Sequence, residues 1–591
     1  MRKYLVLLVV ATIFGTENSE ASQLVPDADG SRDKPIAIRN AQFISMNSND
    51  IAESMVLIVK NGRIDRILPE SEFESAPGHH VIDADGGYVV PGYVDAHYHY
   101  RHSDELLNFL AYGVTTILNL GQPLKETREL IALRESIARG EEAGPQIYTT
   151  ERIIASGIDL KSPEEGRSYV RTLASNGFDF VKIYNEIPQD VFDAVATESK
   201  KQGLSIFGHI PRSFSPEYSL SNGLKVVAHA EEFYFTYFEG ARDKDLDNFD
   251  ATQLPDLGKA ATLIELLIQN QVAVIPTLAG SFAKQVFWDD EKSVFADPEM
   301  RYLHPKLTSL WRSMNILQRE PLAKRMLRER IKYALSHEIT RRMHDAGVPI
   351  VTGTDAAIPN VPPGKSLHRE LRELVKTGLD YREAFEATTS VAGQFVKTYV
   401  DSSANIGQIK VGYEADLVLL ASNPLDNIRN AADVRAVMTD GKWYTSDTIS
   451  ALREIRAERY LNLRKLGSEI RDAVESKSDR AEILDLIAKY NLVDADTFSY
   501  GASLVEGIAF EAFSAGNLDE AIRIVKLNST LFPEIANVWD TLGDVHMHLE
   551  QRDRALQSYR RALEIDETFG ETRIKIQQLE AAQQSGDDSS P

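Results

Sequence analysis

Two histidines separated by one residue, His97 and His99, stand at the end of the apolar run PGYVDAHYH. Side chains two positions apart on a β-strand point to the same side of the strand. Both imidazoles can therefore bind one ion, and a chain without cysteine must use nitrogen and oxygen ligands. Such ligands suit a borderline divalent cation, most simply Zn²⁺. An HxH pair alone is weak evidence for a metal, so its surroundings decide the interpretation.

Four more side chains with metal-binding or acid–base chemistry close later apolar runs: Lys182 in FDFVKIY, His209 in LSIFGHI, His229 in KVVAHAEEF and Asp355 in VPIVTGTDA. Burial would lower the pKa of Lys182 and expose a neutral amine. That amine can react with CO₂ to form a carbamate, an anionic ligand able to bridge two cations. A lysine paired with a nearby carboxylate is the alternative. Asp355 could both bind metal and transfer a proton.

These runs belong to a repeating order of strand and helix over residues 91–399. An α/β fold is expected, with eight β-then-α units that predict a (β/α)₈ TIM barrel. Active sites of such barrels lie at the carboxyl ends of the strands, so the six side chains would meet at one mouth. The helix-rich stretch from Gly280 to about Ser336 is interpreted as an insertion that overhangs this mouth. The strand-like runs are GYVDAHYH, GVTTILNLG, PQIYTTERII, FDFVKIY, LSIFGHI, KVVAHAEEF, VAVIPTLA and VPIVTGTDA.

Other segments flank the predicted barrel. β-type runs at 36–90 and 400–446 predict one composite β-sandwich domain, and 447–496 is expected to be a helical linker. Residues 497–581 show a 34-residue period that predicts tetratricopeptide-like helical repeats. These repeats could cap the enzyme or bind a protein partner. The positions that fit the repeat are Ala521, Pro533, Trp539, Leu542, Gly543, Ala555, Tyr559 and Ala562.

The ends of the chain and its charge concern location and partners. Residues 1–22 combine Arg2 and Lys3 with an apolar stretch and small residues at Ser19 and Ala21, which predicts a signal peptide. An uncleaved anchor is the alternative. Residues 23–35 are expected to be a flexible leader and 582–591 a disordered tail. The protein is therefore expected to be periplasmic or secreted, with no membrane segment after cleavage. The net charge of −23 argues against nucleic acid as a partner.

The motifs PGYVDAHYH, FVKIY, FGHIP, VAHAEE and GTDA, followed by GQIKVGYEADLVLLASNPL, resemble the amidohydrolase superfamily over residues 36–444. The lysine-containing pattern is similar to the branch with two metals and a carboxylated lysine, which includes imidazolonepropionase-like and Xaa-Pro dipeptidase-like hydrolases. This resemblance implies two divalent ions, and Zn²⁺ is the expected metal. His97, His99 and Asp355 would hold the first ion, His209 and His229 the second, and carboxylated Lys182 would bridge them. Tetratricopeptide repeats are not a usual part of this family.

The expected function is hydrolysis of an amide or peptide-like C–N bond in a small-molecule substrate by a metal-bridging hydroxide, with Asp355 as the catalytic proton carrier. Tyr98, Tyr184 and Arg212 are candidate substrate contacts because they neighbour the ligands, although each could instead serve packing or the surface. A mononuclear deaminase or cyclic-amide hydrolase is the first alternative. A scaffold protein with tetratricopeptide repeats and an inactive barrel is the second. The sequence leaves the oligomeric state open.

Overall fold

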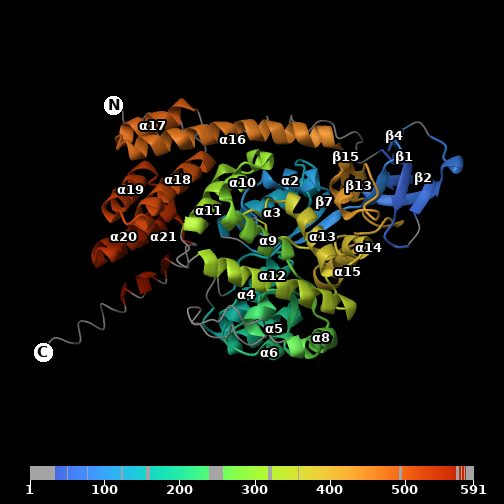
Figure 1. The fold of residues 1–591 in the computed structure, drawn as a ribbon, viewed down its shortest axis with the longest axis horizontal. Coiled ribbons are helices and arrows are strands. Elements are labelled where there is room, and N and C mark those ends of the chain that lie inside the picture. The colour runs from blue at the N-terminus through green and yellow to red at the C-terminus, as the bar shows by residue number, and fades with distance from the viewer. Residues whose placement is uncertain are drawn as a thin grey trace.

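The computed structural model describes residues 34–48, 51–75, 78–121, 124–154, 160–237, 257–316, 322–356, 358–490, 495–567, 572–573, 575–577 and 579–580. The predicted signal peptide, nearly all of the leader and the tail lie outside these residues. A β-sheet lies at one end of the molecule, an α/β body in the middle and a group of helices at the other end (Figure 1). The α/β fold class is confirmed.

One eight-stranded sheet contains strands from both flanking segments of the chain. Its antiparallel pair β5–β13 places Val90 opposite Val418 and so joins residues that are far apart in sequence. Apolar side chains of this sheet, such as Ile38, Leu57 and Met438, form a core of their own. The strands are β1 (Ile36–Ile44), β2 (Ile51–Lys60), β3 (Arg63–Pro69), β4 (His80–Asp83), β5 (Tyr88–Pro91), β13 (Leu417–Leu420), β14 (Val434–Thr439) and β15 (Lys442–Thr445).

The central body contains two parallel sheets in place of one continuous sheet. The first has the order β6–β7–β8 and the second β12–β11–β10–β9. On one side, a single parallel bridge, Ile154–Ile183, connects the two sheets. On the other side the run 350–356 lies between them, with one bridge to each sheet, Val274–Ile350 and Tyr98–Ala356. The strands are β6 (Tyr93–Tyr98), β7 (Val114–Asn119), β8 (Gln146–Thr149), β9 (Phe180–Ile183), β10 (Ser205–Gly208), β11 (Leu224–Ala228) and β12 (Ala273–Ile275).

The expected eighth strand is therefore not a strand, and the prediction of a continuous eight-stranded sheet is corrected. The amide groups of this run bond to three different partners: Val351 to Val274, Thr352 to Ala387 and Asp355 to His97. Asp355 itself has a left-handed backbone, with φ of 59°. An extended ladder cannot continue through such a residue, because strand pairing requires negative φ.

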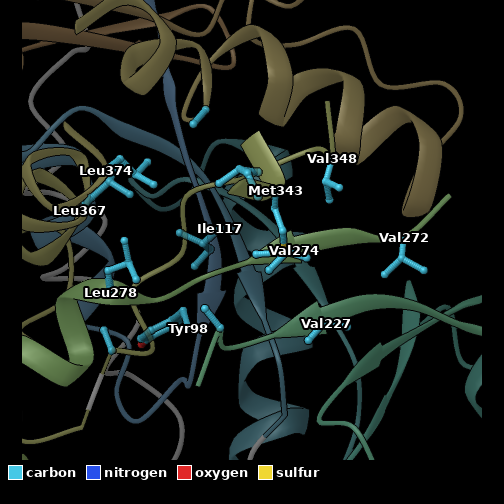
Figure 2. Packing of buried hydrophobic residues seen from close by; sticks show 14 of the residues in the cluster. Tyr98, Ile117, Val227, Val272, Val274, Leu278, Met343, Val348, Leu367 and Leu374 are labelled. Carbon is cyan, nitrogen blue, oxygen red and sulfur yellow. The ribbon is translucent and has the colours of Figure 1, made fainter. Parts of the chain in front are cut away.

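Helices surround the parallel strands and bury their apolar faces against them. Ser162 caps the start of helix α4, because its side chain accepts a hydrogen bond from the Glu165 amide. Gly203, with φ of 74°, caps the end of helix α5. Figure 2 shows part of the resulting core, in which Val274 of β12 and Met343 of α12 belong to one buried cluster. The helices are α2 (Glu105–Ala111), α3 (Leu124–Arg139), α4 (Pro163–Ser175), α5 (Gln189–Gln202), α6 (Pro216–Ser221), α7 (Glu232–Thr236), α8 (Ala260–Gln269), α9 (Leu278–Asp289), α10 (Glu291–Phe295), α11 (Pro305–Ile316), α12 (Leu322–Asp345), α13 (Lys365–Thr377), α14 (Tyr381–Glu386) and α15 (Ser390–Tyr399). Short 3₁₀ helices are η1 (Glu70–Glu72), η2 (Leu257–Lys259), η3 (Pro298–Tyr302) and η4 (Ile428–Ala432).

The C-terminal part is helical, and its first helix runs along the central body (Figure 1). Arg456 of this helix, α16, forms an ion pair of 3.0 Å with Asp104, directly before α2. In the predicted repeat, a Cβ atom on Gly543 would lie 2.3 Å from the ring of Tyr559, so the glycine lets two helices approach. No described helix is long and apolar enough to cross a membrane. The helices are α16 (Ser446–Glu475), α17 (Arg480–Lys489), α18 (Ala495–Ser514), α19 (Leu518–Leu531), α20 (Ala536–His548) and α21 (Arg552–Ile565).

Candidate active site

Four imidazoles from three strand ends meet in the central body. His97 lies in β6 and His99 directly follows it, while His209 and His229 follow β10 and β11. The ring centroid of His97 lies 5.2 Å from that of His99 and 4.6 Å from that of His229. The rings of His209 and His229 are 4.8 Å apart. The parallel strands thus place these histidines at the same end of the body, as expected from the order of the motifs.

Asp355 completes a group of ligand atoms. Its Oδ1 lies 3.4 Å from Nε2 of His97 and 3.3 Å from Nε2 of His99. Donor atoms of His97, His229 and Asp355 all lie within 4.8 Å of one another. Burial raises the pKa of Asp355, but the neighbouring His229 and His99 lower it further, to about 2. Its carboxylate is therefore charged at neutral pH, as a metal ligand must be.

Two of the histidines are held in the neutral form, and three of the four are oriented by contacts at Nδ1. Burial holds the pKa of His97 and of His229 well below the ordinary value, so both rings keep a lone pair for a cation. In three of the four rings Nδ1 contacts an oxygen, which leaves Nε2 for the centre of the site. These contacts join His99 to the Gly121 carbonyl (2.7 Å), His229 to Thr277 Oγ1 (2.8 Å), and His209 to Asn185 Oδ1 and Glu232 Oε1 (3.0 Å each).

Lys182 of β9 is buried, with 1% of its surface exposed. Its Nζ has no hydrogen-bond partner and no carboxylate within 4.0 Å among the described residues. The described residues therefore do not support the alternative, a lysine paired with a carboxylate. Burial lowers its pKa to about 8, against the opposing effect of Asp355 and Glu232, so a substantial fraction of the amine is neutral near pH 8. An amine in that state can form the carbamate that the sequence predicted.

Three residues of the site have a left-handed backbone. His229, Thr277 and Asp355 have φ of 76°, 49° and 59°, a region that residues with a Cβ rarely adopt. The fully buried Asp95 supports this arrangement, because its carboxylate accepts hydrogen bonds from the amide (3.0 Å) and hydroxyl (2.7 Å) of Thr354. Surrounding contacts thus hold the strained residues in the positions that direct their side chains inward.

Two of the three predicted substrate contacts lie beside the ligands. The ring of Tyr184 lies 4.0 Å from that of His209. Arg212, whose side chain is 39% exposed, approaches Glu232 at 3.8 Å. A cation missed by sequence reasoning is Lys284 of α9, which forms an ion pair of 3.7 Å with Glu231 and interacts more weakly with Asp355 and Tyr184. A lysine in an amphipathic helix carries no local signal of such a role, because helices commonly expose lysine to solvent.

The prediction that Tyr98 contacts the substrate is wrong. Its side chain is completely buried in the hydrophobic core, where the hydroxyl donates a hydrogen bond to Glu105 (Figure 2). The physical reason is strand alternation, which directs Tyr98 to the face opposite His97 and His99.

The described donors fit one or more divalent cations. Neutral imidazoles, a charged carboxylate and a buried amine without a partner match the preferences of a borderline metal for nitrogen and oxygen. His97, His229 and Asp355 are the described group whose ligand atoms lie close enough together to hold an ion, and His99 and His209 flank them.

Similarity to known proteins agrees with this arrangement. Residues 312–444 match the amidohydrolase family, and residues 536–569 match the tetratricopeptide repeat. The imidazolonepropionase of Klebsiella pneumoniae (strain 342) is 22% identical over 428 residues, which cover 66% of this chain and 93% of that protein. The crystal structure of a Xaa-Pro dipeptidase with bound methionine in the active site shares the fold, with a TM-score of 0.50, 19% identity, and coverage of 70% of this chain and 100% of the other.

A local similarity is higher in identity but short. The adenine deaminase of Ruegeria sp. (strain TM1040) is 33% identical over 79 residues, so the match spans 13% of this chain and 13% of that protein. Together, the comparisons show an amidohydrolase family match over residues 312–444, a tetratricopeptide repeat match near the C-terminus, and a fold like that of the dipeptidase structure. The resemblance expected from the sequence motifs is confirmed.

Proposed function

We propose that this protein is a metal-dependent hydrolase that cleaves an amide or peptide-like C–N bond, with two divalent cations in its site. The observation that carries the proposal is the meeting of His97, His229 and Asp355 within 4.8 Å, beside a buried Lys182 amine that has no partner among the described residues. The match of residues 312–444 to the amidohydrolase family supports a metal-dependent reaction of this class. When bound, the cations would lower the pKa of water and polarise a carbonyl group.

The residues of the chain then have distinct tasks. Asp355 is ionised and can take a proton at its carboxylate and return it to the leaving nitrogen. Glu232 and Thr277 keep the Nε2 atoms of His209 and His229 turned inward. Lys182, once carboxylated, supplies negative charge in a site otherwise rich in neutral nitrogen.

The positively charged side chains beside the site favour a substrate that carries a carboxylate. Arg212 is exposed enough to meet a ligand, and Lys284, which is paired with Glu231, lies within electrostatic reach of Asp355 and Tyr184. N-acyl amino acids and Xaa-Pro dipeptides combine a scissile C–N bond with such a carboxylate, and the similarity to a Xaa-Pro dipeptidase structure is compatible with the second class.

Metal analysis of the purified protein tests this proposal. Close to two ions per chain, and hydrolysis of members of an N-acyl amino acid and Xaa-Pro dipeptide library, would support it. A metal-free protein that cannot be loaded would contradict it. Conversion of Lys182 to alanine should reduce bound metal toward one ion per chain, whereas conversion of the exposed Lys410 should not.

A deaminase with a single metal is the second candidate, and the short match to adenine deaminase favours it. One ion per chain, release of ammonia from a purine and full activity after loss of Lys182 would select this reaction. The unpartnered, buried Lys182 is the observation that makes it the weaker candidate.

We further propose that the protein is exported and that its C-terminal repeats contact another protein. The N-terminal sequence pattern supports the first statement and the tetratricopeptide match supports the second. N-terminal sequencing of the mature protein tests export, since cleavage is expected after Ala21 or close to it. Affinity capture with the full chain, compared with a chain that ends before α20, tests the second statement.

A further inference from the structure

A cavity lies between the insertion and the C-terminal helices, where elements far apart in sequence meet. Its volume is about 450 Å³, within the range of sites for small organic ligands. Helices α11, α16 and α18 contribute most of the lining, together with residues of α10 and η3. None of the residues that line it belongs to the candidate active site, so its ligand would be bound independently of the proposed function.

Three guanidinium groups line this cavity: Arg312, Arg464 and Arg471. Arg471 forms a two-point contact with Glu511, at 2.6 and 3.0 Å, which neutralises its charge. Arg312 and Arg464 have no carboxylate partner within 4.0 Å among the described residues. Two positive charges without a carboxylate partner in the described part of the chain are unexpected in a protein of net charge −23.

The two unpaired groups are held in place. The guanidinium of Arg464 donates to the carbonyl oxygens of Met300 and Leu303, both at 2.7 Å. The guanidinium of Arg312 lies 4.3 Å from the ring centroid of Phe295. Carbonyl dipoles and a ring face orient a cation but do not neutralise it, so the cavity retains an affinity for negative charge. Burial also lowers the pKa of Arg464, which shows that its charge is poorly solvated.

The rest of the lining is apolar or small. Met300, Leu504 and the ring of Tyr500 are buried and offer a hydrophobic surface. Gly467 lets the Tyr500 hydroxyl approach α16 closely, and Gly507 also lines the cavity. A ligand that fits both parts of the cavity has one anionic end and one apolar end.

We propose that this cavity is a binding site for a small amphipathic carboxylate, with the carboxylate between Arg312 and Arg464 and the apolar part against Met300, Tyr500 and Leu504. A carboxylate is favoured over inorganic phosphate because the apolar lining would leave a phosphate ion partly desolvated without contacts.

Calorimetric titration of the full chain with 3-phenylpropionate and with 3-phenylpropan-1-ol tests this proposal. The two probes share the apolar part, differ in charge, and contain no C–N bond that the enzyme could hydrolyse. The acid should bind about tenfold more tightly than the alcohol, the increment of one charge-assisted contact. Equal binding of the two probes, or no binding of either, would overturn the proposal, and this comparison needs no variant. Inorganic phosphate is the third probe, and tighter binding of phosphate than of the acid would also overturn it.

Variants then locate the site. Arg312→Gln should remove most of the preference for the acid, because Arg312 is exposed and its loss leaves the packing intact. Ser503→Phe, which fills the cavity, should abolish binding of both probes. Arg212→Gln is the matched control at the candidate active site and should leave binding unchanged. Loss of binding in Arg212→Gln with retention in Arg312→Gln and Ser503→Phe would place the ligand elsewhere and refute the proposal.

Discussion

Replacement of Thr277 by valine isolates one hydrogen bond that orients a proposed metal ligand. The Thr277 hydroxyl lies 2.8 Å from Nδ1 of His229, and both side chains are buried. Valine has nearly the same shape and is also branched at Cβ, so the backbone with φ of 49° bears the same strain in both proteins. The variant therefore removes the hydrogen bond and little else.

The magnitude follows from the burial of this pair. A net hydrogen bond is worth about 1 kcal/mol, and an unsatisfied buried partner costs about 1–3 kcal/mol. Loss of such an outer contact to a metal-bound histidine typically weakens metal binding about 10–100-fold, which is about 1.4–2.7 kcal/mol. We expect a weakening in this range for Thr277→Val, because the freed Nδ1 belongs to a buried side chain.

Competition with a chromophoric chelator measures the effect, with metal content determined by mass spectrometry. Thr277→Ser keeps the oxygen and serves as the matched control, and thermal unfolding of the metal-free proteins shows whether the fold is preserved. If valine and serine variants bind metal equally tightly, within about twofold, then Thr277 does not orient a ligand and the reasoning is refuted.

Three other perturbations have defined outcomes. Asp355→Asn should lower kcat by about 10²–10⁴-fold with an unchanged far-UV circular dichroism spectrum, and near-normal turnover would remove Asp355 from the reaction. Burial raises the pKa of Glu373, but hydrogen bonds led by that from His337 lower it from 4.5 to about 2, so its contribution of about 3 kcal/mol is present above pH 4.5 and is lost as pH falls toward 2. The free energy of unfolding should therefore fall less on acidification in Glu373→Gln than in the wild type. An equal fall in both proteins would contradict this. Gly543→Ala should destabilise the C-terminal repeats by about 1–3 kcal/mol in denaturant unfolding, because the added methyl would overlap the Tyr559 ring, and an unchanged midpoint would show that the helices can separate.

Local patterns were enough to select side chains that the structure brings together, but not the groups that orient them. The spacing of His97 and His99 and the apolar neighbours of Lys182 are properties of single strands, so the side of the strand and the burial followed directly from alternation. Glu232 and Thr277 contact histidines that belong to other strand ends, and no short-range pattern distinguishes them from ordinary polar residues.

The same alternation could have excluded Tyr98, whose position between two ligands was taken as proximity to the site. A residue next to a ligand on a strand points away from it, and the structure places this tyrosine in the core. The eighth strand was also overestimated, because the left-handed backbone at Asp355 arises from contacts with β6 that the run VPIVTGTDA does not reveal.

By itself, the sequence determined the class of ligand atoms, the order of the strand–helix units and the glycine and tyrosine positions of the helical repeat, because each depends on residues close together in the chain. The tertiary structure decided which imidazole nitrogen is free, that the buried Lys182 amine has no hydrogen-bond partner among the described residues, and where α11, α16 and α18 enclose a positively charged cavity. Those properties depend on which distant segments pack together, and packing is settled by the burial of the whole chain rather than by any one motif.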